Sequence, residues 1–246
     1  MLQPKTTIDN TKLTTKMPYQ HLFFDLDHTI WDFDKNAEEA LHELFILHKL
    51  QDLGLAAPDI FIETYTRNNH RLWAEYHLGK ISKEVLREAR FKHTFLELGL
   101  DETVIPAGFE DAYVQLCPTK TNLSPYAHEA LQYLQSKYRL YVISNGFKES
   151  TEMKICLCNL QQYFEHVFIS EVIGVNKPDP AIFKHALEIA NAQKPESLMI
   201  GDSLEADVYG ALNFGMDAIY FNPNKTEKPE NVPVQIHHLN ELMLFL

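Results

Sequence analysis

The sequence predicts an α/β protein: a doubly wound parallel sheet into which an all-helical domain is inserted. Two observations predict the sheet, namely short apolar runs that end in polar residues and helical patterns that lie between these runs. A third observation predicts the insertion, because one gap between runs is far longer than a strand-helix-strand crossover requires.

Five apolar runs are predicted to form buried parallel strands. The first, HLFFDLD, begins at His21, after a polar leader that ends near Met17. The other four runs are RLYVIS ending at Ser144, HVFIS ending at Ser170, SLMIG ending at Gly201 and DAIYF ending at Phe221. Helical patterns at 147–163, 179–191 and 204–214 separate these four runs, which is the alternation typical of a parallel sheet.

The insertion is predicted from spacing. From Asp25 to Ser144 the numbering advances by 119, whereas a crossover needs only about 30 residues. Apolar residues at helical spacing fill this gap. The intervals from Ser144 to Lys177 and from Lys177 to Asp202 are 33 and 25 residues, which suits one α/β unit each. We therefore expect a disordered leader at 1–16, a core formed by 17–32 and 118–246, and a helical cap domain at 33–117.

Composition excludes several classes of function. The 246 residues carry 22 Lys+Arg against 34 Asp+Glu, a formal net charge of −12, and no dense basic run. A nucleic-acid polymer is therefore not an expected partner. No stretch of about 18 apolar residues predicts a membrane span, and the leader lacks the apolar segment of a secretory signal. Three cysteines are too few for a disulfide framework, so we expect a cytoplasmic protein with reduced thiols.

Ligands of open parallel sheets bind beyond the carboxyl ends of the strands, so polar residues that follow the apolar runs are candidates for function. Two carboxylates follow the first run, and further polar sets follow the later runs or begin the next helices. Taken singly, such residues are more often helix caps or solvated side chains. The four sets are Asp25-Leu26-Asp27-His28-Thr29, Ser144-Asn145-Gly146, Lys177 before Pro178, and Gly201-Asp202-Ser203 with Asp207.

Together and in this order, the four sets resemble the motifs of the haloacid dehalogenase (HAD) superfamily, which have the pattern D-x-D-x-T, Ser/Thr, Lys, and G-D-S/T-x-x-x-D. The resemblance implies a Rossmannoid core with Asp25 as the nucleophile that forms an aspartyl-phosphate and Asp27 as the general acid/base. It also implies that Ser144, with Thr29, Asn145 and Gly146 beside it, binds the phosphoryl group. Lys177 would neutralise the negative charge and hold the nucleophile.

A metal ion is expected at the same place. A carboxylate that attacks a phosphate dianion meets like-charge repulsion, which a cation relieves. Hard oxygen ligands from Asp25, the Asp27 backbone carbonyl and Asp202 suit Mg²⁺. We place Asp207 next to these ligands rather than on the ion. Two alternative roles stay open for Asp207: direct binding of the ion, and that of an acid in the first turn of a helix, stabilised by the helix dipole.

The second aspartate, Asp27, indicates phosphate-ester chemistry, because the dehalogenases of the superfamily lack it. The cap before the second motif matches subfamily I. A closer resemblance, carried by Phe24–Phe33, Leu72–Tyr76 and Ile143–Phe147, is to the house-cleaning pyrimidine 5′-nucleotidases. It implies a nucleoside 5′-monophosphate as substrate. Residues that could form the nucleoside pocket are Phe33, Trp73, Tyr76, Asn145, Phe147, Arg67, Asn68 and Asn69, although an aromatic at helical spacing is more often core.

Alternatives remain open. A sugar-phosphate phosphatase or a phosphomutase of the same superfamily fits the core equally well, and a non-catalytic phosphate-binding relative is the remote alternative. The expected partner is a small phosphorylated metabolite, and the expected assembly is a monomer or a weak homodimer.

Overall fold

The computed structural model describes residues 19–55 and 57–246, so the predicted disordered leader at 1–16 and Met17 lie outside the described residues. Its centre is a six-stranded sheet with the order β3-β2-β1-β4-β5-β6. Every neighbouring pair is parallel, which confirms the predicted doubly wound sheet. The strands are β1 (His21–Phe24), β2 (Arg139–Ser144), β3 (His166–Ile169), β4 (Ser197–Gly201), β5 (Asp217–Phe221) and β6 (Val234–Ile236).

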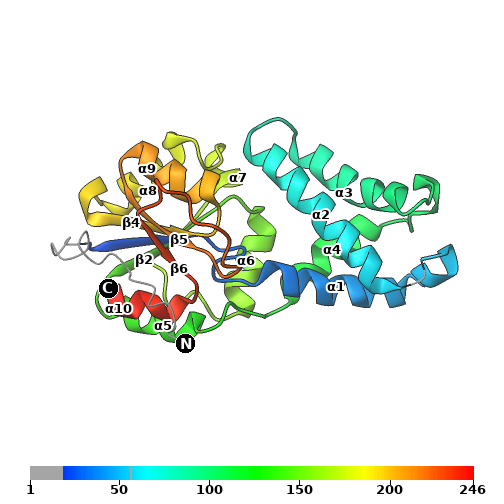
Figure 1. Cartoon of the computed structure of the whole chain (residues 1–246), viewed down its shortest axis with the longest axis horizontal. Helices are drawn as coiled ribbons and strands as arrows, with labels where there is room; N and C mark the ends of the chain where they lie inside the picture. The colour runs from blue at the N-terminus through cyan, green and yellow to red at the C-terminus, as the bar shows by residue number, and fades with distance from the viewer. Residues whose placement is uncertain (1–18, 56) are drawn as a thin grey trace, which may run out of the picture.

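Successive side chains of each strand enter different cores, because they point to opposite faces of the sheet. Leu22 and Phe24 of β1 pack in one buried cluster with α5 (Ala127–Gln135) and α10 (Leu242–Phe245). Phe23 packs on the other face with α8 (Pro180–Ala190) and α9 (Gly210–Phe214). The result is a three-layer core, seen in Figure 1 as helices above and below the sheet.

The helical insertion lies to the right of the sheet in Figure 1. Its interior is aromatic, because rings from three of its helices contact one another, for example Phe91 and Phe109 at 4.8 Å between centroids. The insertion consists of α1 (Phe33–Leu47), α2 (Pro58–His77), α3 (Lys83–Glu97) and α4 (Phe109–Leu116), with the short turns η2 (Leu50–Leu53) and η3 (Glu102–Val104). No described helix is both long and apolar enough to cross a membrane.

Three details differ from the sequence expectation. The helix predicted at 147–163 is α6 (Lys148–Leu157), which ends early because Asn159 adopts a left-handed conformation with φ of 53°. The helix predicted at 204–214 begins as a π-helical turn, η6 (Leu204–Tyr209), before α9. The short edge strand β6 was not predicted. The remaining elements are α7 (Ser170–Ile173) and the turns η4 (Cys117–Thr119), η5 (Lys194–Glu196) and η7 (Leu239–Glu241).

Candidate active site

The site forms where β1 lies between β2 and β4. Phe24, the last residue of β1, pairs with Val142 of β2 and Ile200 of β4. This register places the residues that follow the three strands at one edge of the sheet. The backbone N–H of Asp25 donates to the carbonyl of Ile200 at 2.9 Å, which fixes Asp25 beside the end of β4. Strand order reverses between β1 and β4, the position at which open α/β sheets bind ligands.

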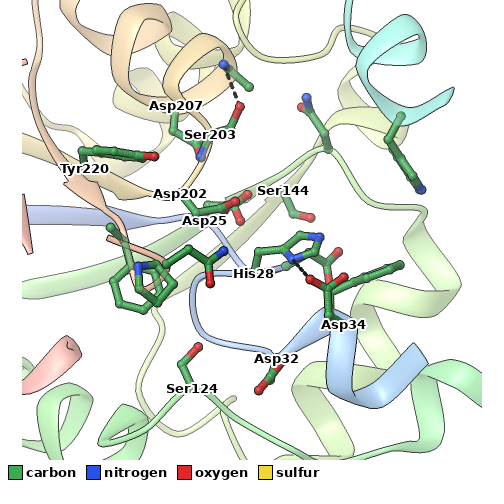
Figure 2. Close-up of a pocket in the computed structure, with 18 of the residues that line it drawn as sticks. Asp25, His28, Asp32, Asp34, Ser124, Ser144, Asp202, Ser203, Asp207 and Tyr220 are labelled. Atoms are coloured by element: carbon green, nitrogen blue, oxygen red, sulfur yellow. Dashed lines mark hydrogen bonds and ion pairs between the residues drawn. The ribbon is translucent and has the colours of Figure 1, made fainter. Parts of the chain in front are cut away.

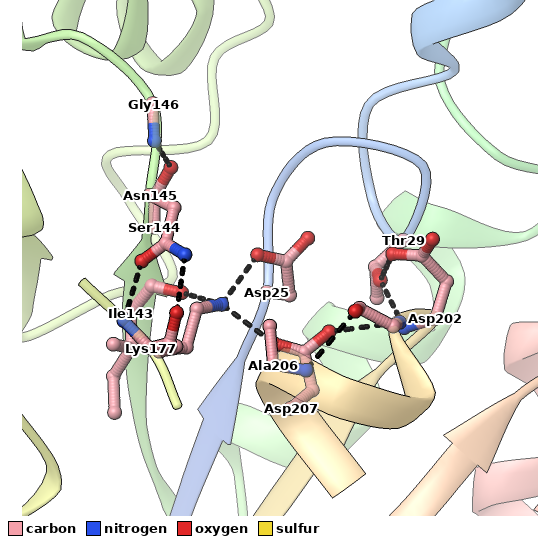
Figure 3. A network of polar contacts seen from close by, with 11 residues as sticks. Asp25, Thr29, Ile143, Ser144, Asn145, Gly146, Lys177, Asp202, Ala206 and Asp207 are labelled. Carbon is pink, nitrogen blue, oxygen red and sulfur yellow. Dashed lines mark hydrogen bonds and ion pairs between the residues drawn. The ribbon is translucent and has the colours of Figure 1, made fainter. Parts of the chain in front are cut away.

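Lys177 is the centre of the polar network in Figure 3. Its Nζ donates to Asp25 Oδ1, to Asp207 Oδ1 and to the carbonyl of Ile143, each at 2.6 Å. The side chain of Lys177 is only 1% exposed. Three acceptors match the three protons of an ammonium group, so the lysine is fully satisfied and its position is fixed.

The backbone around Lys177 is fixed by Asn145, which follows β2. The Asn145 amide donates to the Lys177 carbonyl at 2.9 Å, and its oxygen accepts from the Lys177 N–H at 2.8 Å. Just beyond, the Asp179 side chain caps α8 and Pro180 begins that helix. The end of β2 and the start of α8 therefore position the lysine together.

Asp202 and Asp207 follow β4. The hydroxyl of Thr29 donates to Asp202 Oδ1 at 3.0 Å and accepts from the Asp202 N–H at 3.1 Å. Asp207 Oδ2 accepts from the Ser203 N–H at 3.0 Å. A Cβ on Gly201 would lie 2.2 Å from Asp207 Oδ2, so this close approach requires glycine. Thr29 thus holds Asp202 in place and is itself fully buried.

The charge in this cluster is not balanced by Lys177 alone. Burial raises the pKa of Asp25 well above its ordinary value; Lys177 opposes the shift, and Asp207 and Asp202 add to it. Burial, with the charge of Asp207, raises the pKa of Asp202 to about 8. Burial alone would lower the pKa of Lys177, but Asp207 and Asp25 raise it. The cluster therefore holds more negative charge than one lysine compensates.

This excess charge provides a test of whether a metal ion fits. Carboxylate oxygens of Asp25, Asp202 and Asp207 all lie within 4.8 Å of one another. They are hard oxygen donors in a buried site that lacks one positive charge or more, which suits Mg²⁺. Because Asp207 is already engaged by Lys177 and Ser203, Asp25 and Asp202 are the carboxylates left for an ion.

Asp27, two residues beyond Asp25, has a partner that sequence reasoning missed. Lys154 of α6 donates from Nζ to Asp27 Oδ1 at 2.6 Å, and its side chain is 6% exposed. The ammonium also lies 4.0 Å from the ring centroid of Trp31, a cation–π contact. No motif marks Lys154, and the pair spans 127 positions in the sequence, so only the folded chain brings it to the site.

Ser144 and Gly146 form the third side of the site. Ser144 is 1% exposed, and its Oγ accepts from the Gly146 N–H at 3.0 Å. A Cβ on Gly146 would lie 2.8 Å from Thr151 Oγ1 and 3.4 Å from Asp27 Oδ2. The turn therefore brings the hydroxyl and a backbone amide close to Asp27, an arrangement that can hold an oxyanion.

A cavity of about 550 Å³ lies between these residues and the insertion. Figure 2 shows several of its polar side chains converging from the ends of β1, β2 and β4. From the insertion, one face of α2 lines the cavity at helical spacing, with α1 beside it. The lining residues from these two helices are Phe33, Asp34, His70, Trp73, Ala74 and His77.

The predicted pocket residues separate into two groups. Phe33, Trp73, Asn145 and Gly146 line the cavity, whereas Thr29 does not. Among the remaining aromatics, Tyr76 also lies outside the lining. It packs against Phe147, with 5.9 Å between ring centroids, and so joins the insertion to the core.

The polar residues of α2 that were candidates for the nucleoside do not reach the cavity lining. Arg67 pairs with Glu97 of α3 at 2.5 Å, and Asn68 donates to the same carboxylate at 2.9 Å. Asn69 is also absent from the lining. Arg67 and Asn68 thus connect α2 to α3, and none of the three side chains lines the cavity in this structure.

Three of the histidines that line the cavity, His28, His70 and His77, are not among the predicted site residues. His28 occupies a variable position of the D-x-D-x-T pattern, and His70 and His77 lie in α2 without a motif. Burial, with the nearby charge of Lys177, lowers the pKa of His77 to about 4. The only signal in the sequence is the seven-residue spacing from His70 to His77, which places both on one face of a helix.

Comparison with known proteins agrees with this geometry. A family model described as haloacid dehalogenase-like hydrolase matches residues 19–215. The pyrimidine 5′-nucleotidase PynA of Streptococcus pneumoniae is 35% identical over 215 residues, covering 86% of this chain and 87% of PynA. A glyceraldehyde 3-phosphate phosphatase of Pyrococcus abyssi is 34% identical over 214 residues, covering 83% of this chain and 82% of that enzyme.

Among solved structures, the magnesium-bound crystal structure of the HAD-hydrolase YfnB from Bacillus subtilis is similar to the whole fold. The two superpose with a TM-score of 0.81 at 27% sequence identity, covering 92% of this chain and 97% of YfnB. The similarity therefore includes both the sheet and the helical insertion.

Proposed function

This chain belongs to the haloacid dehalogenase-like hydrolase family, and from that premise we propose that it is a magnesium-dependent phosphoric monoester hydrolase acting on pyrimidine nucleoside 5′-monophosphates. The observation that carries the proposal is the buried arrangement of Asp25, Lys177 and Asp202 beside Asp27 at the reversal point of the sheet. We also propose that residues 17–32 and 118–246 form the catalytic core and that residues 33–117 form the cap domain.

Asp25 is the proposed nucleophile. Lys177 holds Asp25 Oδ1, while Oδ2 makes no hydrogen bond with any described residue and is the oxygen available to attack. Attack forms the bond between Asp25 Oδ2 and phosphorus and breaks the bond from phosphorus to the ester oxygen. Ser144 and the turn at Gly146 bind the phosphoryl oxygens, on which charge develops.

Asp27 is the proposed general acid and base. It gives its proton to the departing ester oxygen, and it then takes a proton from the water that attacks the phosphorus of the aspartyl-phosphate. This second step releases inorganic phosphate and restores Asp25. The 3.4 Å from Asp27 Oδ2 to the Cβ position at Gly146 supports a location next to the phosphoryl site.

Asp25, Asp202 and the backbone carbonyl of Asp27 are the groups that would hold Mg²⁺, with Asp207 as a neighbour bound to Lys177. When bound, the ion would supply the positive charge that offsets repulsion between carboxylate and phosphate. The raised pKa of Asp202 supports the need for such a charge. We expect EDTA to abolish turnover and added Mg²⁺ to restore it.

The substrate class rests on the cavity and on one relative. A cavity of about 550 Å³ with two aromatic rings, Phe33 and Trp73, could accommodate a pyrimidine nucleoside. The pyrimidine 5′-nucleotidase that is 35% identical supports this class. The 34% identical glyceraldehyde 3-phosphate phosphatase favours a second candidate, a small sugar phosphate. The expectations of a cytoplasmic location and of a monomer or weak homodimer stay predictions.

Phosphate release across a panel of substrates tests the proposal. The panel contains UMP, dUMP and dTMP, matched purine monophosphates, small sugar phosphates and p-nitrophenyl phosphate, each with Mg²⁺. We expect the highest kcat/KM for the pyrimidine nucleotides. Preference for sugar phosphates would reject the nucleotidase proposal but keep the phosphatase proposal. An isomerised product without phosphate release would identify a mutase. No turnover of any substrate would favour a non-catalytic relative.

Lys154 is predicted to position the general acid. Lys154→Met removes the hydrogen bond to Asp27 Oδ1 but keeps an unbranched side chain of similar length against Trp31. Because general acid–base catalysis contributes roughly 10²–10⁴-fold, loss of its alignment should lower kcat by about 10- to 100-fold. We expect KM to change little, since Lys154 does not line the cavity.

Lys148→Met is the matched control, because Lys148 begins the same helix and its side chain is 56% exposed. It should leave kcat and KM unchanged. The pH profile of kcat should shift in Lys154→Met and not in the control. If both variants keep the wild-type kcat and pH profile, Lys154 has only a structural role.

A further inference from the structure

A second cluster of potential metal ligands lies at the cavity, apart from the buried carboxylates. It consists of His28 in the loop after β1, Asp34 in the first turn of α1 and His70 in α2, and one ligand atom from each lies within 4.8 Å of the others. His28 Nδ1 is 3.8 Å from Asp34 Oδ2, and His70 Nε2 is 3.1 Å from Asp34 Oδ1. Figure 2 shows His28 and Asp34 lying beside each other. None of the three has a role in the proposed hydrolysis.

The donor set differs in kind from the magnesium site. Two imidazole nitrogens and one carboxylate oxygen suit Zn²⁺, Co²⁺ or Ni²⁺, whereas Mg²⁺ prefers six oxygen ligands. Zinc bonds to nitrogen and oxygen are about 2.0–2.2 Å long, so ligand atoms in a tetrahedral site lie about 3.4 Å apart. The 3.1 and 3.8 Å separations lie on either side of this value but involve different oxygens of Asp34, so binding through one of these oxygens requires a movement of the side chains.

The cluster is also accessible to an ion. Side-chain exposures are 32% for His28, 51% for Asp34 and 47% for His70. All three residues line the cavity. Three protein ligands leave a fourth tetrahedral position free, as in zinc sites that bind water or a further ligand. Because the side chains come from the loop after β1 and from two helices of the insertion, an ion would link the two parts beside the cavity.

We propose that His28, Asp34 and His70 bind a zinc-class transition-metal ion, which ties the loop after β1 to α1 and α2 and inhibits hydrolysis by competing with the leaving group. The competition follows from position, since Phe33 lines the same cavity and its ring centroid lies 4.9 Å from that of His28. The inhibitory consequence rests on the proposed function, whereas binding of the ion does not.

Binding is measured by calorimetric titration of Zn²⁺ into the full-length, untagged protein in excess Mg²⁺, which keeps the carboxylate site occupied. Co²⁺ provides a second readout, because Co²⁺ bound by nitrogen ligands at a low coordination number absorbs visible light strongly. We expect one equivalent to bind. His70→Ala and Asp34→Asn should each weaken the affinity for Zn²⁺ by about tenfold or more. Even mutations of residues that only hydrogen-bond to metal ligands reach this factor.

The matched control is His42→Ala. His42 also lies on the insertion and faces a carboxylate, at 3.9 Å from Asp59, but it forms an isolated pair. It should keep the wild-type affinity for Zn²⁺. Circular dichroism and thermal unfolding check that each variant is folded. Equal Zn²⁺ affinity in wild type, His70→Ala and Asp34→Asn would overturn the site, as would binding that is lost in Asp202→Asn but not in His70→Ala.

Kinetics test the inhibitory part separately. With Mg²⁺ in excess, Zn²⁺ should raise the apparent KM in the wild type and not in His70→Ala, and further Mg²⁺ should not reverse the effect. Relief by Mg²⁺ would mean that Zn²⁺ acts at the carboxylate site, which would overturn the proposal. If the wild type binds Zn²⁺ through His70 but hydrolyses no phosphomonoester, the metal site stands and the proposed function fails.

Discussion

Asp25→Asn is expected to lower phosphate release by on the order of 10⁴-fold or more while the protein stays folded, because loss of a catalytic nucleophile removes most of the rate enhancement. Asparagine has nearly the same volume, and its amide oxygen can still accept from Lys177, which retains Asp207 and the Ile143 carbonyl as partners. The substitution also removes a buried carboxyl group, whose pKa burial raises above its ordinary value. We therefore expect a thermal midpoint in EDTA no lower than that of the wild type.

The measurement compares single-turnover phosphate release in the variant, the wild type and an Asp52→Asn control, in which the altered carboxylate is exposed on η2. Rapid acid quench and peptide mass spectrometry should detect a phosphoryl group on Asp25 in the wild type and the control only. Peptide mapping also excludes deamidation of the introduced asparagine back to aspartate. Turnover above about 1% of the wild type in the undeamidated variant would refute the role of Asp25 as nucleophile.

The ends of the strands explain why so much of the core could be predicted. A buried parallel strand is a short apolar run, and the residue that ends the run sits at the ligand-binding edge whatever the tertiary details. The sequence therefore predicts that Asp25, Ser144 and Asp202 lie close together at one edge of the sheet. The edge strand β6 could not, because three residues, Val234–Ile236, give no recognisable run.

Contacts made by helices were harder to predict, because a helix has many faces and sequence does not say which face meets the site. Lys154 reaches Asp27 only because α6 packs beside the loop after β1. His70 and Trp73 line the cavity, whereas Arg67, on the same helix, turns to Glu97. These outcomes depend on the rotation of α2 about its axis, which is set by the aromatic interior of the insertion.

Lys177→Met should abolish activity and lower the free energy of unfolding in EDTA by about 3–5 kcal/mol, the range measured when one partner of a buried ion pair is removed. Lys177 is 1% exposed, and its loss leaves Asp25 and Asp207 without the cation they share. Urea denaturation measures the change. Lys184→Met, on α8 with a side chain that is 70% exposed, is the control and should stay within about 0.5 kcal/mol of the wild type.

The same variant tests whether the destabilisation comes from charge or from packing. If it comes from uncompensated carboxylates, Mg²⁺ should stabilise Lys177→Met more than the wild type, because the ion then binds a more negative site. At a concentration 100 times Kd, bound Mg²⁺ adds about 2.7 kcal/mol. Asp207→Asn combined with Lys177→Met should likewise cost less than the sum of the two single changes. The opposite result would be a double variant whose loss of stability equals the sum of the two single losses, together with a Lys177→Met variant that Mg²⁺ stabilises no more than the wild type. It would show that Lys177 stabilises the fold through packing and not by compensating the charge of the carboxylates.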